Sequence, residues 1–242
     1  MTVPKSIALL LMATLGGALA VPVTIGDPSF EINSLSAGAW SNNLSPEWSE
    51  SGGPNNGNAF EEFIVGFSSN GTDHLGMNVG QNVWQDLSET YQANTRYTLT
   101  VAHGHRTGST GNSNQSTFSL RAPDNTIFAS AFENSFSLAG GSFADSSPLV
   151  LDTSVTPAAI GETIRIHLLA GGGGRSHFDN IRLDATPIEP DGTASLSNTP
   201  ASAIGSSTAT LNGTVTDVGD ASPSITLFYG TTDGGIVAGS WD

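Results

Sequence analysis

His103 and His105, separated by one glycine, are the residues whose type and spacing first suggest chemistry. On a strand, alternation would place both imidazoles on one face. His167 or His177 could then add a third nitrogen ligand for a metal ion. No carboxylate follows closely along the chain to complete such a site. We therefore expect that the strand ends at Ala102 and that the two histidines lie in a polar rim without binding a metal.

Adjacent carboxylates occur at Glu61 and Glu62. If they lie on a strand, they point to opposite faces and cannot flank one glycosidic bond, for which a retaining hydrolase needs two carboxyl groups about 5–5.5 Å apart. Asp86 has no evident acidic partner. The chain also lacks the G-x-S-x-G segment of a serine nucleophile. We therefore expect no catalytic residues, with a polysaccharide-degrading enzyme as the less favoured reading.

Trp84 is the tryptophan most suited to contact a ligand. In the segment 83–87, Val83 and Leu87 are the core candidates, which leaves Trp84 and Asp86 on the outward face. A flat aromatic ring offers apolar area and a negative π-face to the C–H side of a sugar. Neighbouring planar polar groups can then bind the hydroxyls.

Trp40 and Trp48 lie in a segment rich in Asn, Ser and Gly, residues 36–58, which suits a loop at the rim of a binding surface. We include Trp48 among the candidate ligand-binding residues. For Trp40 we favour packing over binding, because loop tryptophans often cap the open end of a β-sandwich.

The composition excludes several classes of protein. The formal net charge is −15 with only seven Lys and Arg residues, so nucleic acid and anionic lipid are not expected partners. There is no cysteine, which excludes thiol catalysis and zinc–thiolate sites. Residues 1–20 combine Lys5, an apolar run and an Ala-Leu-Ala end, which predicts a secretory signal peptide, no membrane insertion and an extracellular or cell-surface location.

Short alternating segments recur through the rest of the chain, separated by Gly, Asn, Ser, Asp and Pro. They predict strands and no helix longer than two turns, as in an all-β sandwich or barrel. The candidate strands are 63–67, 83–87, 97–103, 117–122, 126–132, 148–155, 163–170 and 178–185.

A change of composition predicts a domain boundary. Residues 187–193 are rich in Pro, Gly and acidic side chains, as linkers between domains are. Residues 194–242 contain two further strand candidates, at 208–216 and 224–230. This length is about half of an immunoglobulin-type sandwich, so we expect an incomplete second β-domain.

Two motifs in order carry a family resemblance. The segment IGDPSFE (25–31) opens the main domain and HFDNIRL (177–183) closes it, with VWQDL and ANTRYTLTVAHGHR between them. The chain resembles the galactose-binding-like jelly-roll domains of bacterial secreted proteins, in particular their carbohydrate-binding modules. The resemblance covers residues 21–186. Residues 194–242 are similar to fibronectin-type or immunoglobulin-like repeats.

The resemblance implies a structural calcium ion between the first and last strands. Carried over, Glu31 and Asp179 become the side-chain ligands, with Asp27 as a third. Asp179 has the same parity as Ile181 and Leu183, so we expect its carboxylate to point inward, where an unpaired charge is costly. The alternative is that Asp179 satisfies backbone groups at a turn.

The resemblance also places Trp84, Asp86 and Arg106 on outward faces of one sheet, where they would bind a carbohydrate together with Trp48. The expected protein is then an exported, non-catalytic carbohydrate-binding or adhesive module that is joined to other modules of the same polypeptide. The rival is a structural spacer without a ligand, which a buried Trp84 would favour.

Overall fold

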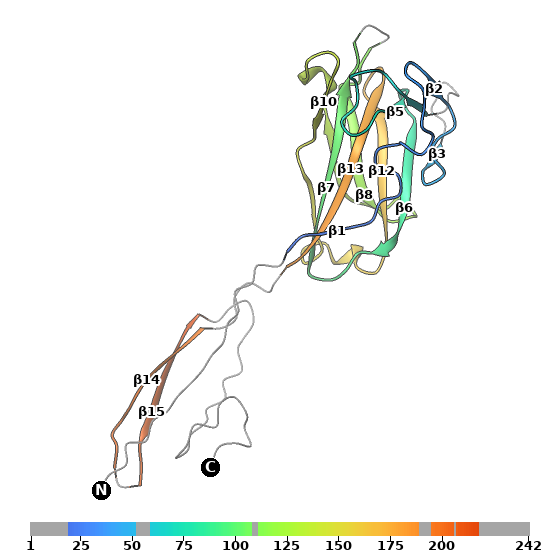
Figure 1. The fold of residues 1–242 in the computed structure, drawn as a ribbon. Helices are drawn as coiled ribbons and strands as arrows, with labels where there is room; N and C mark the ends of the chain where they lie inside the picture. Colours follow the sequence, from blue (N-terminus) through green and yellow to red (C-terminus); the bar gives the residue numbers. More distant parts are fainter. Residues whose placement is uncertain (1–18, 52–58, 108–110, 189–194, 206, 218–242) are drawn as a thin grey trace. The chain divides into compact units, whose positions relative to one another are not determined.

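The computed structural model describes residues 19–51, 59–107, 111–188, 195–205 and 207–217 (Figure 1). The predicted signal peptide lies outside this part except for its last two residues. Residues 189–193 of the predicted linker, the strand candidate 224–230 and Trp241 also lie outside it. Within the described residues, no helix reaches the length and apolarity that crossing a bilayer requires.

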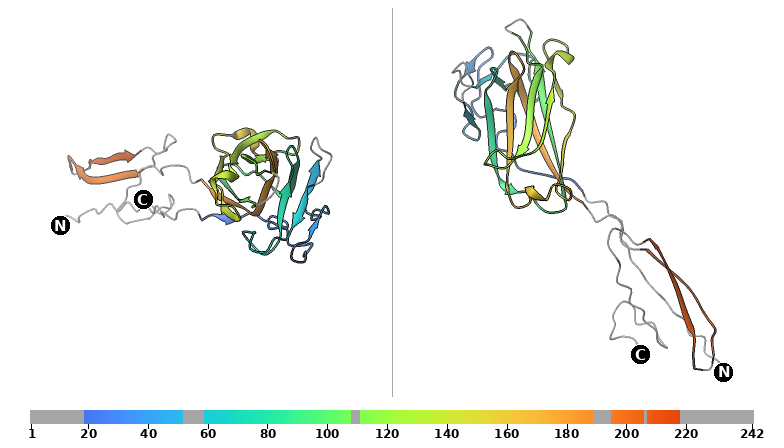
Figure 2. Two further views of the ribbon diagram at one scale, coloured as in Figure 1. Left: turned by 90° about the horizontal axis from the view of Figure 1, so that it is seen from above. Right: turned by 180° about the vertical axis from the view of Figure 1, so that it is seen from behind.

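Residues Ala18–Ile188 form one compact unit built from two antiparallel sheets that face each other (Figure 2). In the described part, the larger sheet has the strand order β10 (Ser142–Asp145), β7 (Thr95–His105), β13 (Ser176–Pro187), β5 (His74–Met77), β4 (Phe60–Glu62), β2 (Trp40–Ser41). Two further strands pair with it: β1 (Val21–Pro22) with β13, and β11 (Leu149–Asp152) with β7. The smaller sheet has the order β3 (Ser49–Ser51), β6 (Asn82–Thr90), β12 (Thr163–Gly171), β8 (Gln115–Arg121), β9 (Ile127–Glu133).

The core lies between the two sheets and is built by the alternation visible in the sequence. Val83 and Leu87 on β6 face Leu99 and Val101 on β7 across a continuous apolar cluster. Two short 3₁₀ turns, η1 (Ser135–Ser137) and η2 (Pro157–Ala159), are the helical segments of the described residues. The predicted all-β jelly-roll sandwich is confirmed.

Most predicted strands match observed ones, but residues 63–67 do not. Ile64 and Phe67 form an isolated bridge around a turn, in which the Phe67 N–H donates to the Ile64 carbonyl. Gly66 adopts a φ of +77°, a conformation that suits glycine and ends the strand. The strand in this region is β4, which lies immediately before the predicted segment.

The strand β13 contains a bulge that changes which residues face the core. Between Asp179 and Arg182 it has one residue more than its neighbour β7. Asn180 takes up the irregularity with a φ of +46°, which asparagine tolerates better than most residues. As a result Phe178, rather than Asp179, shares the core-facing side with Ile181. Asp179 is buried, as predicted, but it lies on the opposite side of the strand from Ile181.

The second unit is described through one antiparallel ribbon, β14 (Ser195–Ser202) paired with β15 (Thr210–Asp217). The strand β15 covers most of the candidate segment 208–216. A two-stranded ribbon does not define an immunoglobulin-like sandwich, so that part of the sequence analysis stays a prediction.

Gly76 on β5 allows a close contact that positions part of the larger sheet's outer face. It is the register partner of Phe60, whose ring would overlap any Cβ built at this position. We expect Gly76→Ala to lower the free energy of unfolding by about 1–3 kcal/mol, because the aromatic ring must move. Urea unfolding followed by tryptophan fluorescence measures this.

The matched control is Gly173→Ala. No atom lies within 4 Å of a Cβ built on Gly173, and its φ is not positive. An equal loss of stability in both variants would show that the Phe60 contact does not matter.

Candidate functional site

A pocket of about 340 Å³ lies at the outer face of the larger sheet. Its lining combines aromatic rings with charged and amide side chains, namely Trp40, Asn42, Phe60, Glu62, Asn78, Arg106 and Arg175. The pocket draws these residues from β2, β4, the end of β7 and the segment that enters β13. Segments far apart in the sequence therefore contribute to one site.

The alternation on β4 selects which of two adjacent carboxylates enters the pocket. Glu62 lines it together with Phe60. Glu61 is buried elsewhere and accepts hydrogen bonds from the Ser45 N–H and the Asn33 amide. The prediction that Glu61 and Glu62 point to opposite faces is confirmed.

Two arginines are held in fixed positions around the pocket. Arg106 Nη2 lies 2.9 Å from Glu62 Oε1, and the backbone of Arg106 exchanges two hydrogen bonds with the Asn112 side chain. Arg175 Nε donates to Asn78 Oδ1, and its guanidinium lies 5.2 Å from the centre of the Phe60 ring. The two guanidinium groups that could donate to a ligand are therefore already oriented without one.

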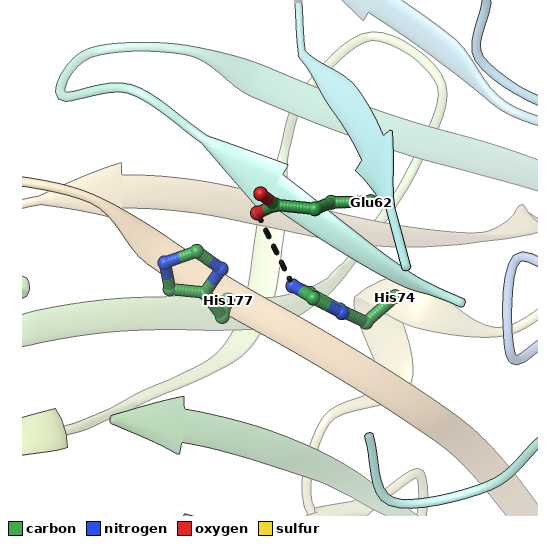
Figure 3. Close-up of side chains that lie close together, drawn as sticks. All are labelled: Glu62, His74 and His177. Carbon is green, nitrogen blue, oxygen red and sulfur yellow. Dashed lines mark ion pairs between the residues drawn. The ribbon is translucent and has the colours of Figure 1, made fainter. Parts of the chain in front are cut away.

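Beside the pocket, Glu62, His74 and His177 converge (Figure 3). Each offers one ligand atom, and the three atoms lie within 4.8 Å of one another. The described residues contain no other group of three histidine or acidic side chains that meets this criterion. All three side chains are buried.

Burial dominates the ionisation of this cluster. It lowers the pKa of His74 to about 3, with a further contribution from the positive charge of Arg106. It also lowers the pKa of His177 well below the usual range of histidine. Burial raises the pKa of Glu62, while Arg106 and Arg175 act in the opposite direction. Both imidazoles are therefore neutral at pH 7.

The smaller sheet carries the predicted pair Trp84 and Asp86. Arg165 Nε and Nη2 donate to the two Asp86 carboxylate oxygens, at 2.6 and 2.7 Å, and the guanidinium lies 5.4 Å from the centre of the Trp84 ring. Arg106 directly follows β7 of the larger sheet. The prediction that Trp84, Asp86 and Arg106 share one sheet is wrong, because β6 and β7 are consecutive strands in opposite sheets.

The two loop tryptophans have roles opposite to those expected. Trp48 is only 5% exposed, packs against Phe30 and donates its indole N–H to the Asp27 carbonyl, so it cannot stack on a ligand in this conformation. Trp40 is 62% exposed and lines the pocket. Ligand contact thus fits Trp40 rather than Trp48.

The carboxylates expected to bind calcium contact backbone groups. Asp179 is fully buried, and its Oδ2 accepts from the N–H groups of Ser69 and Asn70. Glu31 accepts from the N–H groups of residues 72 and 73. Asp27 accepts from the N–H groups of residues 31 and 32 within its own turn. Glu31 and Asp179 are therefore brought to the same loop, while Asp27 caps a separate turn.

Burial raises the pKa of Asp179 to about 6. The backbone hydrogen bonds oppose this effect, whereas the negative charge of Glu31 adds to it. Asp179 is therefore a costly charge, mainly because it is buried and in addition because the Glu31 carboxylate repels it.

His103 and His105 both lie within β7, so the expectation that this strand ends at Ala102 is wrong. His103 is buried, and His105 Nδ1 lies 2.7 Å from the Leu138 carbonyl oxygen. His177 lies with His74 instead of with this pair.

Comparisons with known proteins identify one family and several similar structures. A family model described as "HpiC1-like: HpiC1 cyclase" matches residues 21–184. A comparison with curated proteins found no match. The solved structures with a similar fold include carbohydrate-binding modules.

One of these is a xylan-binding domain of carbohydrate-binding module family 22, which is 11% identical, with 73% of this chain and 99% of that chain covered and a TM-score of 0.38. TmCBM61 in complex with β-1,4-galactotriose is 10% identical, with 65% and 94% covered and a TM-score of 0.38. The xylanase 10B module pair of Clostridium thermocellum, complexed with xylohexaose, is 12% identical, with a TM-score of 0.37. The match covers 74% of this chain and 30% of that one. At these identities and TM-scores, the ligands of those proteins are not assigned to this chain.

His167, buried on the outer face of the smaller sheet, makes stability depend on pH. Its pKa is lowered to about 4, mainly by burial and in addition by the positive charges of Arg121 and Arg165. The unfolded chain, with a usual histidine pKa of about 6.5, therefore binds more protons between pH 6.5 and pH 4. We expect the contribution of this group to the free energy of unfolding to be fully present above pH 6.5. This contribution should decrease by up to about 3 kcal/mol as the pH falls to 4.

The measurement is urea unfolding at a series of pH values for the wild type and His167→Gln. Well above pH 7 the His167 imidazole carries no proton in either the folded or the unfolded chain, which provides an internal reference. The difference in stability between wild type and variant should shrink or reverse on acidification. Parallel curves down to pH 4 would contradict the assignment.

Proposed function

The chain belongs, over residues 21–184, to the HpiC1-like family, and we propose that its jelly-roll domain binds a carbohydrate in the pocket beside Trp40. The observation that carries the proposal is an exposed indole next to fixed guanidinium, carboxylate and amide groups. An indole face can stack on the C–H side of a sugar ring. The polar groups around it can donate to and accept from hydroxyls.

The dimensions of the pocket agree with a small ligand. Its volume of about 340 Å³ is near the lower end of the range of about 300–1,000 Å³ found for ligand sites. Arg106 and Arg175 are held by Glu62 and Asn78, so little side-chain entropy is lost when a ligand binds. The site thus suits a short segment of a glycan.

We propose further that the protein is an exported, non-catalytic module of a larger extracellular polypeptide. The apolar segment within residues 1–20 supports export, and the composition of residues 187–193 supports a joint to other modules. Weak binding by one module would then be strengthened by repetition along such a chain.

A glycan array, followed by calorimetry with the oligosaccharide that binds best, tests the proposal. We expect Trp40→Ala to weaken binding by on the order of tenfold or more, because the stacking surface is lost. The matched control is Trp84→Ala, the same change on the smaller sheet, which should leave the affinity unchanged.

Loss of binding in Trp84→Ala alone would move the site to the smaller sheet and restore the pair Trp84 and Asp86 as ligand-binding residues. Absence of any bound glycan would favour the spacer function. Circular dichroism of both variants checks that the fold is retained.

Membership of a family described as a cyclase favours ring closure as a second candidate function. Trp40 and Phe60 would supply the walls of a pocket for an apolar substrate, and Glu62 the acidic group. Ring closure by isomerisation leaves the mass of a compound unchanged but alters its chromatographic retention. Recovery of a bound compound with its retention unchanged would argue for binding without catalysis.

We also propose that Glu31 and Asp179 hold a structural calcium ion. The support is that two carboxylates, one fully buried, are brought to the loop 69–73 and repel each other. A cation between them would remove that repulsion, and calcium accepts carboxylate and carbonyl oxygens in flexible geometry. The oxygens of Asp27 are engaged in its own turn, so Asp27 would act by shaping the approach of Glu31.

The chain, stripped with EDTA and dialysed, should melt at a higher temperature after calcium alone is added back. At a concentration 100 times the dissociation constant, we expect a rise of roughly 5–10 °C. Asp179→Asn keeps an acceptor for the Ser69 and Asn70 N–H groups but removes the charge, so its shift should be small.

Asp184→Asn, a change on the same strand, is the control and should keep the shift. If calcium has no effect on the wild type, Asp179 acts only as an acceptor for backbone N–H groups.

A further inference from the structure

The cluster of Glu62, His74 and His177 is built by the register of three neighbouring strands. Glu62 on β4 is the direct partner of His74 on β5. His177 on β13 is the partner of Gly76, two residues beyond His74 on the same face of β5. His177 is therefore the diagonal neighbour of His74. Figure 3 shows the three side chains converging.

Five polar atoms of this cluster have no hydrogen-bond partner within the described part of the chain. They are Glu62 Oε2 and both ring nitrogens of His74 and of His177. Both histidines are 0% exposed. Buried polar groups without partners cost free energy and are rare in native proteins. Five at one place would be satisfied by a species that binds several of them at once.

The two oxygens of Glu62 face different partners. Oε1 pairs with Arg106 in the pocket, whereas Oε2 lies 3.8 Å from His74 Nε2. Tetrahedral zinc bonds of about 2.0–2.1 Å place two ligand atoms about 3.3 Å apart. Glu62 and His74 would need to approach by about 0.5 Å to hold an ion, and the ligand atoms that are up to 4.8 Å apart would need to approach by up to about 1.5 Å.

We propose that Glu62, His74 and His177 bind one divalent transition-metal ion, with zinc as the best-matched metal. Two imidazoles and one carboxylate are a zinc ligand set that leaves a fourth position for water or a substrate atom. Imidazole nitrogens favour such metals over calcium, which prefers oxygen ligands alone. Because Glu62 also lines the pocket, the ion would lie next to the space that a ligand occupies.

The environment of the cluster is aromatic. Phe67 contacts both imidazole rings, with ring centres 5.0 Å from His74 and 5.5 Å from His177, and Phe143 lies 5.5 Å from His74. This shell provides no acceptor for the outer ring nitrogens, although metal-binding histidines commonly have one. The rival explanation is that the imidazoles are packed here as neutral aromatic rings.

Zinc titration of the untagged, EDTA-stripped chain by calorimetry, with metal analysis after dialysis, distinguishes the two. We expect one equivalent of zinc in the wild type. His177→Phe and His74→Phe should weaken binding by more than about 100-fold, since loss of even an outer-shell partner costs 10–100-fold. His105→Gln, a histidine outside the cluster, should bind zinc normally.

Glu62→Gln covers the case in which a phenylalanine variant does not fold, because it keeps the shape of the side chain and removes the charged ligand. It should bind zinc more weakly while its circular dichroism remains that of the wild type. Absence of stoichiometric zinc in the wild type, or unchanged binding in the folded variants, would overturn the proposal in favour of packed aromatic rings.

The zinc proposal does not rest on carbohydrate or calcium binding, and the variants separate the three. Trp40→Ala should keep zinc and lose the glycan. Asp179→Asn should keep zinc and lose the response to calcium, whereas His177→Phe should keep the response to calcium and lose zinc. Loss of zinc binding in Asp179→Asn as well would show that the proposed calcium site and the proposed zinc site are the same site.

Discussion

The outer face of the larger sheet depends on the bulge in β13. Strand alternation from Ile181 and Leu183 alone would put His177 on the core side. The extra residue between Asp179 and Arg182 reverses the alternation, so that Phe178 enters the core and His177 joins His74 outside it. The backbone N–H groups of Ser69 and Asn70 hold Asp179 at the start of this bulge. One irregularity therefore positions both the buried carboxylate and the histidine cluster.

The same face is costly to build, because it buries polar side chains on a sheet surface that in most sandwiches meets solvent. Phe67 and Phe143 cover the two histidines, and Gly104 leaves space for the Phe143 ring. A sandwich that served only as a spacer would gain from apolar side chains at positions 62, 74 and 177. The cost of burying these groups is the reason why the metal ion is proposed at this cluster.

Sequence reasoning predicted the alternating core well, because the period of two is a local property. Val83 and Leu87 face the core as expected. The sequence did not predict which residues approach each other through strand pairing, or which loop residues are buried. The local sequence around His74 does not indicate a site, because nothing in it shows that β4, β5 and β13 are neighbours.

Trp40 and Trp48 illustrate the second limit. Both lie in one polar segment with similar local composition, and only the tertiary fold buries Trp48 against Phe30 while it exposes Trp40. The error over Asp179 has a different origin. Counting parity assumes an unbroken strand, and the bulge at Asn180, which has a φ of +46°, breaks it.

Glu62 links the two sites proposed on the larger sheet. Its Oε1 pairs with Arg106, which a ligand in the pocket would contact, and its Oε2 faces the histidines. A ligand that draws Arg106 away leaves more negative charge on the carboxylate and strengthens its attraction for a cation. Linkage requires the reverse as well, so a bound cation would change the affinity for that ligand by the same factor. If both proposed sites bind their ligands, this carboxylate between an arginine and two imidazoles would couple them without any movement of the strands.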